Sequence, residues 1–341
     1  MLRFLSSLFS SPTEQAGRLD DALIDAAIER AVDGTDSRIR LLRNYRKRLR
    51  APVTAAAEHI IGLVDRLPAP IEIGKSTYST DARIRAFFAS VDHLDEVVGG
   101  FGMARSYLRH VSGSPPECVF GLLTMARLER TVFGMALENH QVRQDIQQVA
   151  VSFSDHRYVC PTAAEDETRW ELKKRGYDFL VERALGRIAA AKSKRVELEG
   201  QRKLLAHKRK IMQAGHWGLD LESAAAEPVT TDVQALEAEI EATEQQLLAL
   251  GADTGAIETS LDYLVDTLSQ PAIWLSTRVA TLHIDYRGIK IAANAGHATP
   301  VEILELYSGD ALSRVALLGW IASSALRQRS SLFDKASRYL G

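Results

Sequence analysis

Apolar residues in the stretch 164–270 recur at alternating spacings of three and four. In its second half this stripe comprises Val233, Leu236, Ile240, Thr243, Leu247, Leu250, Thr254, Ile257, Leu261, Leu264 and Leu268. In its first half the same spacing runs through Tyr177, Val181, Ala184, Ile188, Ala191, Arg195, Leu198, Arg202, Leu205, Arg209 and Met212. Such a stripe needs a partner helix along its length, because it would otherwise expose a continuous apolar surface. The connection 213–231 contains Gly215, Gly218 and Pro228, which favour a turn, so the pattern predicts an antiparallel coiled-coil hairpin.

The charges of the two halves support this pairing. Residues 192–210 contain eight Lys or Arg and two Glu, whereas residues 220–244 contain eight Asp or Glu and no Lys or Arg. Opposite charges beside the seam select the partner and its orientation. Pairing outward from the turn places Met212 near Val233, Arg202 near Thr243 and Tyr177 near Leu268. We expect an intramolecular arm, with pairing to another chain as the alternative, and a break near Gly251 and Gly255.

On either side of residues 164–270, apolar residues recur at every second position, as in a strand, and no longer at helical spacing. Residues 146–160 and 279–292 are rich in β-branched and aromatic side chains that alternate with polar ones. We expect the two stretches to pair into a small sheet at the base of the arm. Val151, Phe153, Ile284 and Ile289 should then be buried in one core.

The remaining patterns favour helices. We predict them over 13–34, 37–50, 52–67, 81–90, 103–110, 118–139, 300–307 and 310–328. The stretch 118–139 is apolar on most sides, which indicates a helix at the centre of the core. The expected fold is mainly α, with a helical body (1–160 and 275–341), a small antiparallel β element and the inserted coiled-coil hairpin arm (164–270).

Composition narrows the class of protein only slightly. The 341 residues are 46 % hydrophobic and 25 % charged with a formal net charge of −2, which is typical of soluble proteins. Two cysteines are too few for a disulfide framework, and the apolar run 315–326 is shorter than the roughly 20 residues that span a bilayer. The first twelve residues do not resemble a cleaved signal peptide. We therefore expect a cytoplasmic protein, and we predict no cofactor.

The two β stretches contain the best candidates for a metal site. Asp155 and His156 lie in one, and His283 and Asp285 lie two residues apart in the other. Two imidazoles and two carboxylates could bind a metal or transfer protons, if the strands bring them together. The alternative is that they are polar residues on the solvent side of a half-buried sheet. Asp92–Glu96 also groups three acids around His93, a pattern more typical of a solvated helix end.

The predicted helix 37–50 is strongly basic. It has seven cations and no acid between residues 38 and 50: Arg38, Arg40, Arg43, Arg46, Lys47, Arg48 and Arg50. Such a cluster could bind phosphate backbones, anionic lipid or an acidic protein. It could equally be a helix face neutralised by acids elsewhere in the chain.

These patterns favour a non-enzymatic interaction or scaffold protein that contacts another protein, or a second copy of itself, through the arm and the basic segment. Two alternatives remain. One is a metal-dependent enzyme or metalloprotein with its site at the base of the arm, and the other is a peripheral nucleic-acid or anionic-membrane binder that uses residues 38–50.

Overall fold

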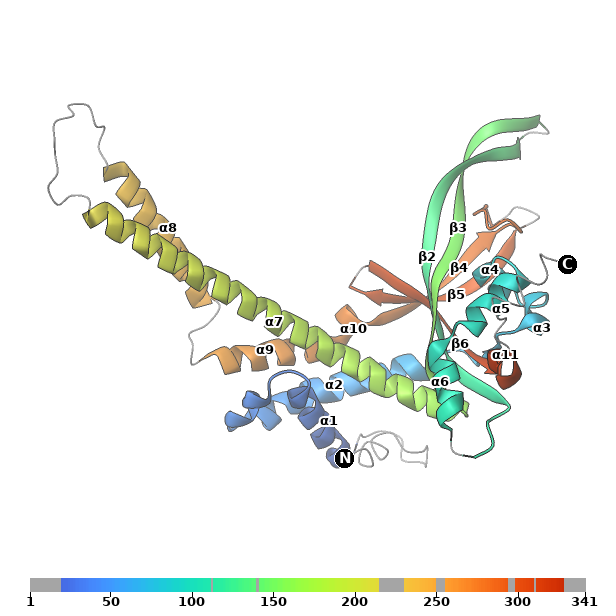
Figure 1. Ribbon diagram of the computed structural model, residues 1–341, viewed down its shortest axis with the longest axis horizontal. Coiled ribbons are helices and arrows are strands. Elements are labelled where there is room, and N and C mark those ends of the chain that lie inside the picture. Colours follow the sequence, from blue (N-terminus) through green and yellow to red (C-terminus); the bar gives the residue numbers. More distant parts are fainter. Residues whose placement is uncertain are drawn as a thin grey trace, which may run out of the picture. The chain divides into compact units, whose positions relative to one another are not determined.

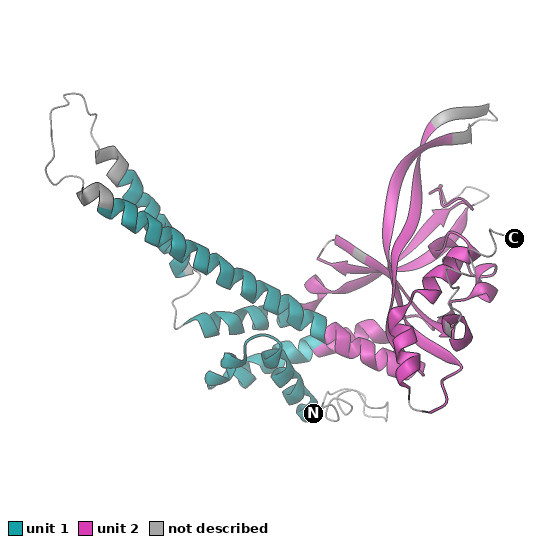
Figure 2. Ribbon diagram, in the orientation of Figure 1, with its two compact units in different colours: residues 1–8, 12–56, 178–270 teal, residues 9–11, 57–177, 271–341 magenta. Residues whose placement is uncertain are grey.

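The computed structural model describes residues 20–111, 113–138, 141–214, 230–249, 255–293, 298–309 and 311–327. They form two compact units (Figure 2). The described residues of the first unit fall within 12–56 and 178–270, and those of the second within 57–177 and 271–341. These bounds differ from the predicted body and arm. The apolar segment at the start of the chain lies outside the described residues.

The first unit is helical. It contains α1 (Asp21–Asp33), the 3₁₀ helix η1 (Ser37–Leu41), the first part of α2 (Tyr45–Asp65), α7 (Glu165–Ala214) from residue 178 onward, α8 (Thr230–Ala249) and α9 (Ala256–Ser269). The predicted second helix of the hairpin is thus two helices, α8 and α9. Residues 250–254 between them lie outside the described part.

Helix α7 buries part of the stripe that the sequence predicts, whereas Arg202 of that stripe is exposed. Val181, Ala184, Ile188 and Leu198 on α7 are buried, as are Leu236, Ile240 and Thr243 on α8 and Leu261, Leu264 and Leu268 on α9. The charged side chain of Arg187 on α7 reaches α9, where its Nη1 lies 2.6 Å from Asp266 Oδ2 and 2.9 Å from Thr267 Oγ1. Figure 1 shows α8 running along the outer part of α7. We call α8 and the part of α7 beyond Lys192 the outer arm.

The second unit is built on a six-stranded sheet. Its strands are β1 (Ile71–Glu72), β2 (Cys118–Glu138), β3 (Gln141–Thr162), β4 (Ser276–Ile284), β5 (Thr299–Ser308) and β6 (Ala311–Ala322). The order is β3-β2-β6-β5-β4 with antiparallel neighbours, and β1 pairs with β6 in parallel. The short helices are α3 (Lys75–Tyr78), α4 (Ala82–Phe87), α5 (Val91–Gly99), α6 (Gly102–His110), α10 (Pro271–Trp274) and α11 (Ser323–Arg327).

The prediction of a mainly α fold with a small β element is therefore wrong. The stretches 118–139, 300–307 and 310–328, which we predicted as helices, contain strands β2, β5 and β6. The error in β2 has a physical reason. Leu122 and Thr124 are buried on one face while Leu123 and Met125 are buried on the other, so the part of the strand inside the core has no polar side.

The chain that follows β4, at one end of the strand order, is hydrogen-bonded to β3 at the other end. Residues that follow β4 bridge to β3 at Ala150–Ile289 and to the end of β4 at Ile284–Lys290. The backbone N–H of Val151 donates to the Gly288 carbonyl at 2.9 Å, and that of Lys290 donates to the Val149 carbonyl at 2.8 Å. The two predicted β stretches thus do meet, but four other strands complete the sheet.

The enclosed face of the sheet carries the core of this unit. Side chains of α4, α5 and α6, among them Phe87, Leu94 and Ala104, pack on it. Figure 1 shows these helices beside the sheet. Val151, Phe153, Ile284 and Ile289 are all buried, as predicted. No helix in the described part of the chain combines the length and the apolar character needed to cross a bilayer.

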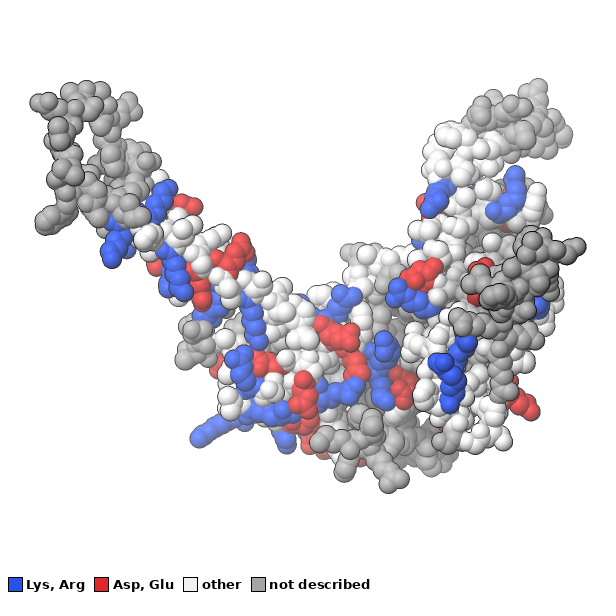
Figure 3. Space-filling model, in the orientation of Figure 1, with Lys and Arg blue, Asp and Glu red and all other residues white. Residues whose placement is uncertain are grey.

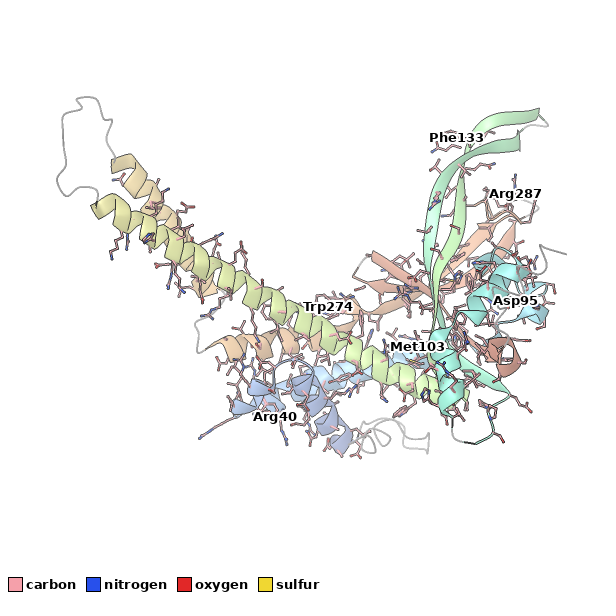
Figure 4. The ribbon with its side chains drawn as sticks, viewed as in Figure 1. Arg40, Asp95, Met103, Phe133, Trp274 and Arg287 are labelled. Atoms are coloured by element: carbon pink, nitrogen blue, oxygen red, sulfur yellow. The ribbon has the colours of Figure 1, made fainter. Side chains whose placement is uncertain are left out.

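Two phenylalanines of the β2–β3 hairpin provide a matched test of this core. Phe153 is 8 % exposed and packs edge-on against Phe87 at 4.8 Å, whereas Phe133 is 73 % exposed on the outer part of β2 (Figure 4). We expect Phe153→Ala to lower the free energy of unfolding by about 3–5 kcal/mol, because it leaves a cavity. Phe133→Ala should change it by less than about 1 kcal/mol. Urea unfolding of the two variants measures both, and equal losses would contradict this placement of the core.

Candidate functional site

Asp155 and His156 lie in a β-bulge. The register of β2 with β3 passes from Thr124–Arg157 to Ala126–Ser154, so these two residues oppose the single residue Met125. Asp155 adopts a positive φ of 49°, which a bulged aspartate tolerates better than most side chains. The bulge turns the two neighbours toward different partners.

His156 joins the sheet to the helices above it. Its Nε2 lies 2.9 Å from the Phe87 carbonyl at the end of α4, and its ring stacks on Phe88 with centroids 4.9 Å apart. The ring of His93 on α5 meets it edge-on at 5.6 Å, and the Nδ1 of His93 accepts the Ala89 N–H at 3.1 Å. Burial lowers the pKa of His156, with a smaller contribution from the adjacent His93. With its ring uncharged, His156 is therefore a latch between β3 and the helices α4 and α5.

The carboxylate of Asp155 is an ion-pair partner. The guanidinium of Arg314 on β6 lies 2.9 Å from it and that of Arg157 lies 3.0 Å from it. Hydrogen bonds from these two arginines lower the pKa of Asp155. The carboxylate is thus held charged on the surface of the sheet.

Asp285 forms the turn that follows β4. Its Oδ1 accepts the backbone N–H of Arg287 at 2.8 Å and that of Ile289 at 2.9 Å, while Gly288 takes a φ of 78°. The Arg287 guanidinium pairs with Oδ2 at 3.0 Å. His283 stands opposite Pro300 in the register of β4 with β5, and its backbone carbonyl accepts the Ile291 N–H at 2.9 Å. The His283 imidazole makes no hydrogen bond with a described residue.

The four residues of the predicted metal site thus have separate partners. Within the described ranges, no group of three or more His, Cys, Asp or Glu could hold a metal ion. A polar network that we did not predict lies on the sheet instead: Glu305 is buried, accepts from Arg127, and accepts from the Tyr307 hydroxyl at 2.6 Å. The sequence contains a signal for this network. Arg127 and Glu305 each stand two positions from an apolar core residue, and residues two apart in a strand share a face of the sheet.

The basic segment is largely neutralised within its own unit. Five of its seven cations pair with acids: Arg38 with Asp36, Arg40 with Glu29 and Asp33, Arg46 with Glu29, Arg48 with Asp262, and Arg50 with Asp21 and Asp25. Arg43 and Lys47 are exposed and form no ion pair with any described residue. The segment therefore serves mainly to hold η1 and α2 against α1 and α9.

The outer arm carries charge that its own hairpin does not pair. Its ion pairs among the described residues, Lys194–Glu197 and Arg195–Glu199, are both within α7. Three lysines of α7 beyond them and four acids of α8 are exposed and form no ion pair with a described residue: Lys203, Lys208 and Lys210 on one helix, and Glu237, Glu239, Glu241 and Glu244 on the other. Figure 3 shows cationic and anionic side chains along this surface. It is the candidate interaction surface of the chain.

Comparison of the chain with protein-family models, with curated proteins and with solved structures finds no match.

The latch at His156 predicts a pH dependence of stability. Because the pKa of His156 is lowered in the folded chain, the unfolded chain takes up this proton first as the pH falls. The free energy of unfolding should decrease between about pH 7 and pH 5, by up to about 1.4 kcal/mol per pH unit from this group. His156→Gln should flatten that slope, while His283→Gln, as a control, should retain it. An unchanged slope in His156→Gln would show that the latch does not titrate in this range.

A second prediction concerns Asp36, the buried acid of the basic segment. Its carboxylate accepts the Arg38 N–H at 3.2 Å and pairs with Lys192 of α7 at 3.0 Å. We expect Asp36→Ala to lower the free energy of unfolding by about 1–3 kcal/mol, because a helix cap and a buried hydrogen-bond acceptor are lost. Asp33→Ala, whose side chain is 63 % exposed, should cost less than about 1 kcal/mol. Chemical unfolding compares the two variants. The pKa of Asp36 lies well below its usual range, so the stability that this carboxylate contributes should be lost only below about pH 4.

Proposed function

We propose that this chain is a non-enzymatic interaction or scaffold protein whose contact element is the outer arm. The observation that carries the proposal is the separation of charge on this arm. Lys203, Lys208 and Lys210 are exposed on α7, Glu237, Glu241 and Glu244 are exposed on α8, and none of them has an ion-pair partner among the described residues. Two adjacent columns of opposite charge give a long surface that a partner of matching charge recognises.

The seam of the hairpin supports the same proposal. Leu198, Leu236, Ile240 and Thr243 are buried between helices whose other faces are exposed. Ordered apolar packing holds the outward side chains in fixed positions, so a partner that binds them pays little to order the surface. The contact would therefore be made by a preformed surface.

The basic segment has a smaller part in the proposal than the sequence suggested. Arg43 and Lys47 are its cations without an acidic partner in the described part of the chain, and Leu41 beside them is exposed. We assign them a secondary contact with an acidic protein partner. We place this activity in the cytoplasm, because Cys118 and Cys160 are free thiols, as is usual in a reducing compartment.

The proposal can be tested by photo-crosslinking in cells of the organism that makes the protein. A photoreactive amino acid replaces Val196 on α7, which is 69 % exposed, or Val279 on β4, which is 67 % exposed. The two sites match in residue type and exposure and differ in the element that carries them. We expect Val196 to give a discrete protein adduct and Val279 to give none. The absence of an adduct from Val196, or equal adducts from both, would contradict an interaction role for the arm.

A further inference from the structure

One flank of the outer arm carries an ordered set of exposed residues. Each stands one position after a residue of the predicted seam: Val196 after Arg195, Lys203 after Arg202, Glu241 after Ile240, Glu244 after Thr243, and Leu248 after Leu247. In an antiparallel pair of helices, positions that follow the seam in this way project to the same side of both helices. These five side chains therefore share one flank, which we call the Val196 flank.

The pairing that the sequence predicts aligns the flank residues in level. In this pairing Arg202 is level with Thr243, so Val196 is level with residue 249, beside Leu248, and Lys203 is level with residue 242, beside Glu241 and Glu244. Val196 and Leu248 are 69 % and 74 % exposed. The flank thus has two apolar side chains, Val196 and Leu248, on its inner part. Lys203, next to Glu241 and Glu244, lies about 10 Å farther along the arm than Val196.

The flank is complementary to a copy of itself in one orientation. A two-fold axis parallel to the arm places α7 of one copy over α8 of the other at the same level. Val196 then meets the second copy's Leu248, and Lys203 meets its Glu241 and Glu244, each contact occurring twice. A two-fold axis across the arm would place the lysines of α7 over each other and the acids of α8 over each other, which is repulsive.

We propose that two copies of this chain associate side by side through the Val196 flank, with their arms parallel. The outer arms then form four helices in which positive and negative helices alternate. Val196 and Leu248 of the two copies are then buried between the arms. The pairs of Lys203 with Glu241 and Glu244 lie farther along the arms, toward their tips. This inference rests on the proposed function, because it names a second copy as the partner of the arm.

Charge exchange between two variants tests the proposal with the full-length chain. Variant A carries Lys203→Glu, and variant B carries Glu241→Lys with Glu244→Lys. Each variant alone places like charges across the interface, so sedimentation equilibrium should show dimerisation at least about tenfold weaker than for the unchanged chain. A mixture of A and B restores opposite charges at both contacts and should form a heterodimer. Repulsion within either chain is unaffected by mixing, so recovery on mixing reports contact between copies.

Controls separate this contact from a fold defect. Arg130→Glu, at an exposed position of β2, should leave dimerisation unchanged, and helical circular dichroism of A and B should equal that of the unchanged chain. Dimerisation of the unchanged chain should weaken with added salt. A chain that stays monomeric over the micromolar range, or an A and B mixture that does not associate, would overturn the proposal.

The outcome also distinguishes this inference from the proposed function. A monomeric chain that still gives a discrete adduct from Val196 with a different protein would remove self-association and leave the interaction role in place. A monomeric chain with no adduct from Val196 would remove both.

Discussion

A helix of 50 residues cannot leave a continuous apolar stripe in water, and α7 covers its stripe with different partners along its length. At Val181, Ala184 and Ile188 the stripe is buried in the first unit, where η1 and α9 are fixed to α7 by Lys192–Asp36 and Arg187–Asp266. Farther out, the buried residues of α8 provide the cover. The same packing determines which side chains remain outside, so the seam defines both the core of the arm and its exposed surface.

In the second unit, polar residues that could have formed a reactive site fix the path of the backbone instead. Asp155 and His156 occupy a bulge, where one binds Arg314 and the other contacts Phe87 and His93. Asp285 accepts two backbone N–H groups of the turn that brings residues 288–290 to β3 (Figure 4 labels Arg287 in this turn). Satisfied hydrogen bonds of this kind stabilise a turn and leave few lone pairs for a metal or substrate.

Long helices with one apolar stripe could be predicted from the sequence, whereas elements without a polar face could not. The helices α7, α8 and α9 and many of their buried positions could be predicted, because a stripe repeated over many turns has one helical solution. Strand β2 could not, because both faces of its part from Gly121 to Met125 are buried and its Leu, Met and Ala residues favour helices. The ion pairs of residues 38–50 could not be foreseen either. Their acids, Asp21, Glu29 and Asp262, come from distant segments that only the fold brings near.

Hydrogen exchange followed by mass spectrometry, at two protein concentrations, tests most directly whether one chain alone completes the seam. If α7 and α8 of a single chain cover each other, amides around Leu198 and Ile240 should already be protected at nanomolar concentration. Association with a second copy through the Val196 flank would add to this protection at micromolar concentration without being needed for it. Fast exchange around Leu198 and Ile240 at the low concentration, slowed only at the high one, would contradict the intramolecular seam.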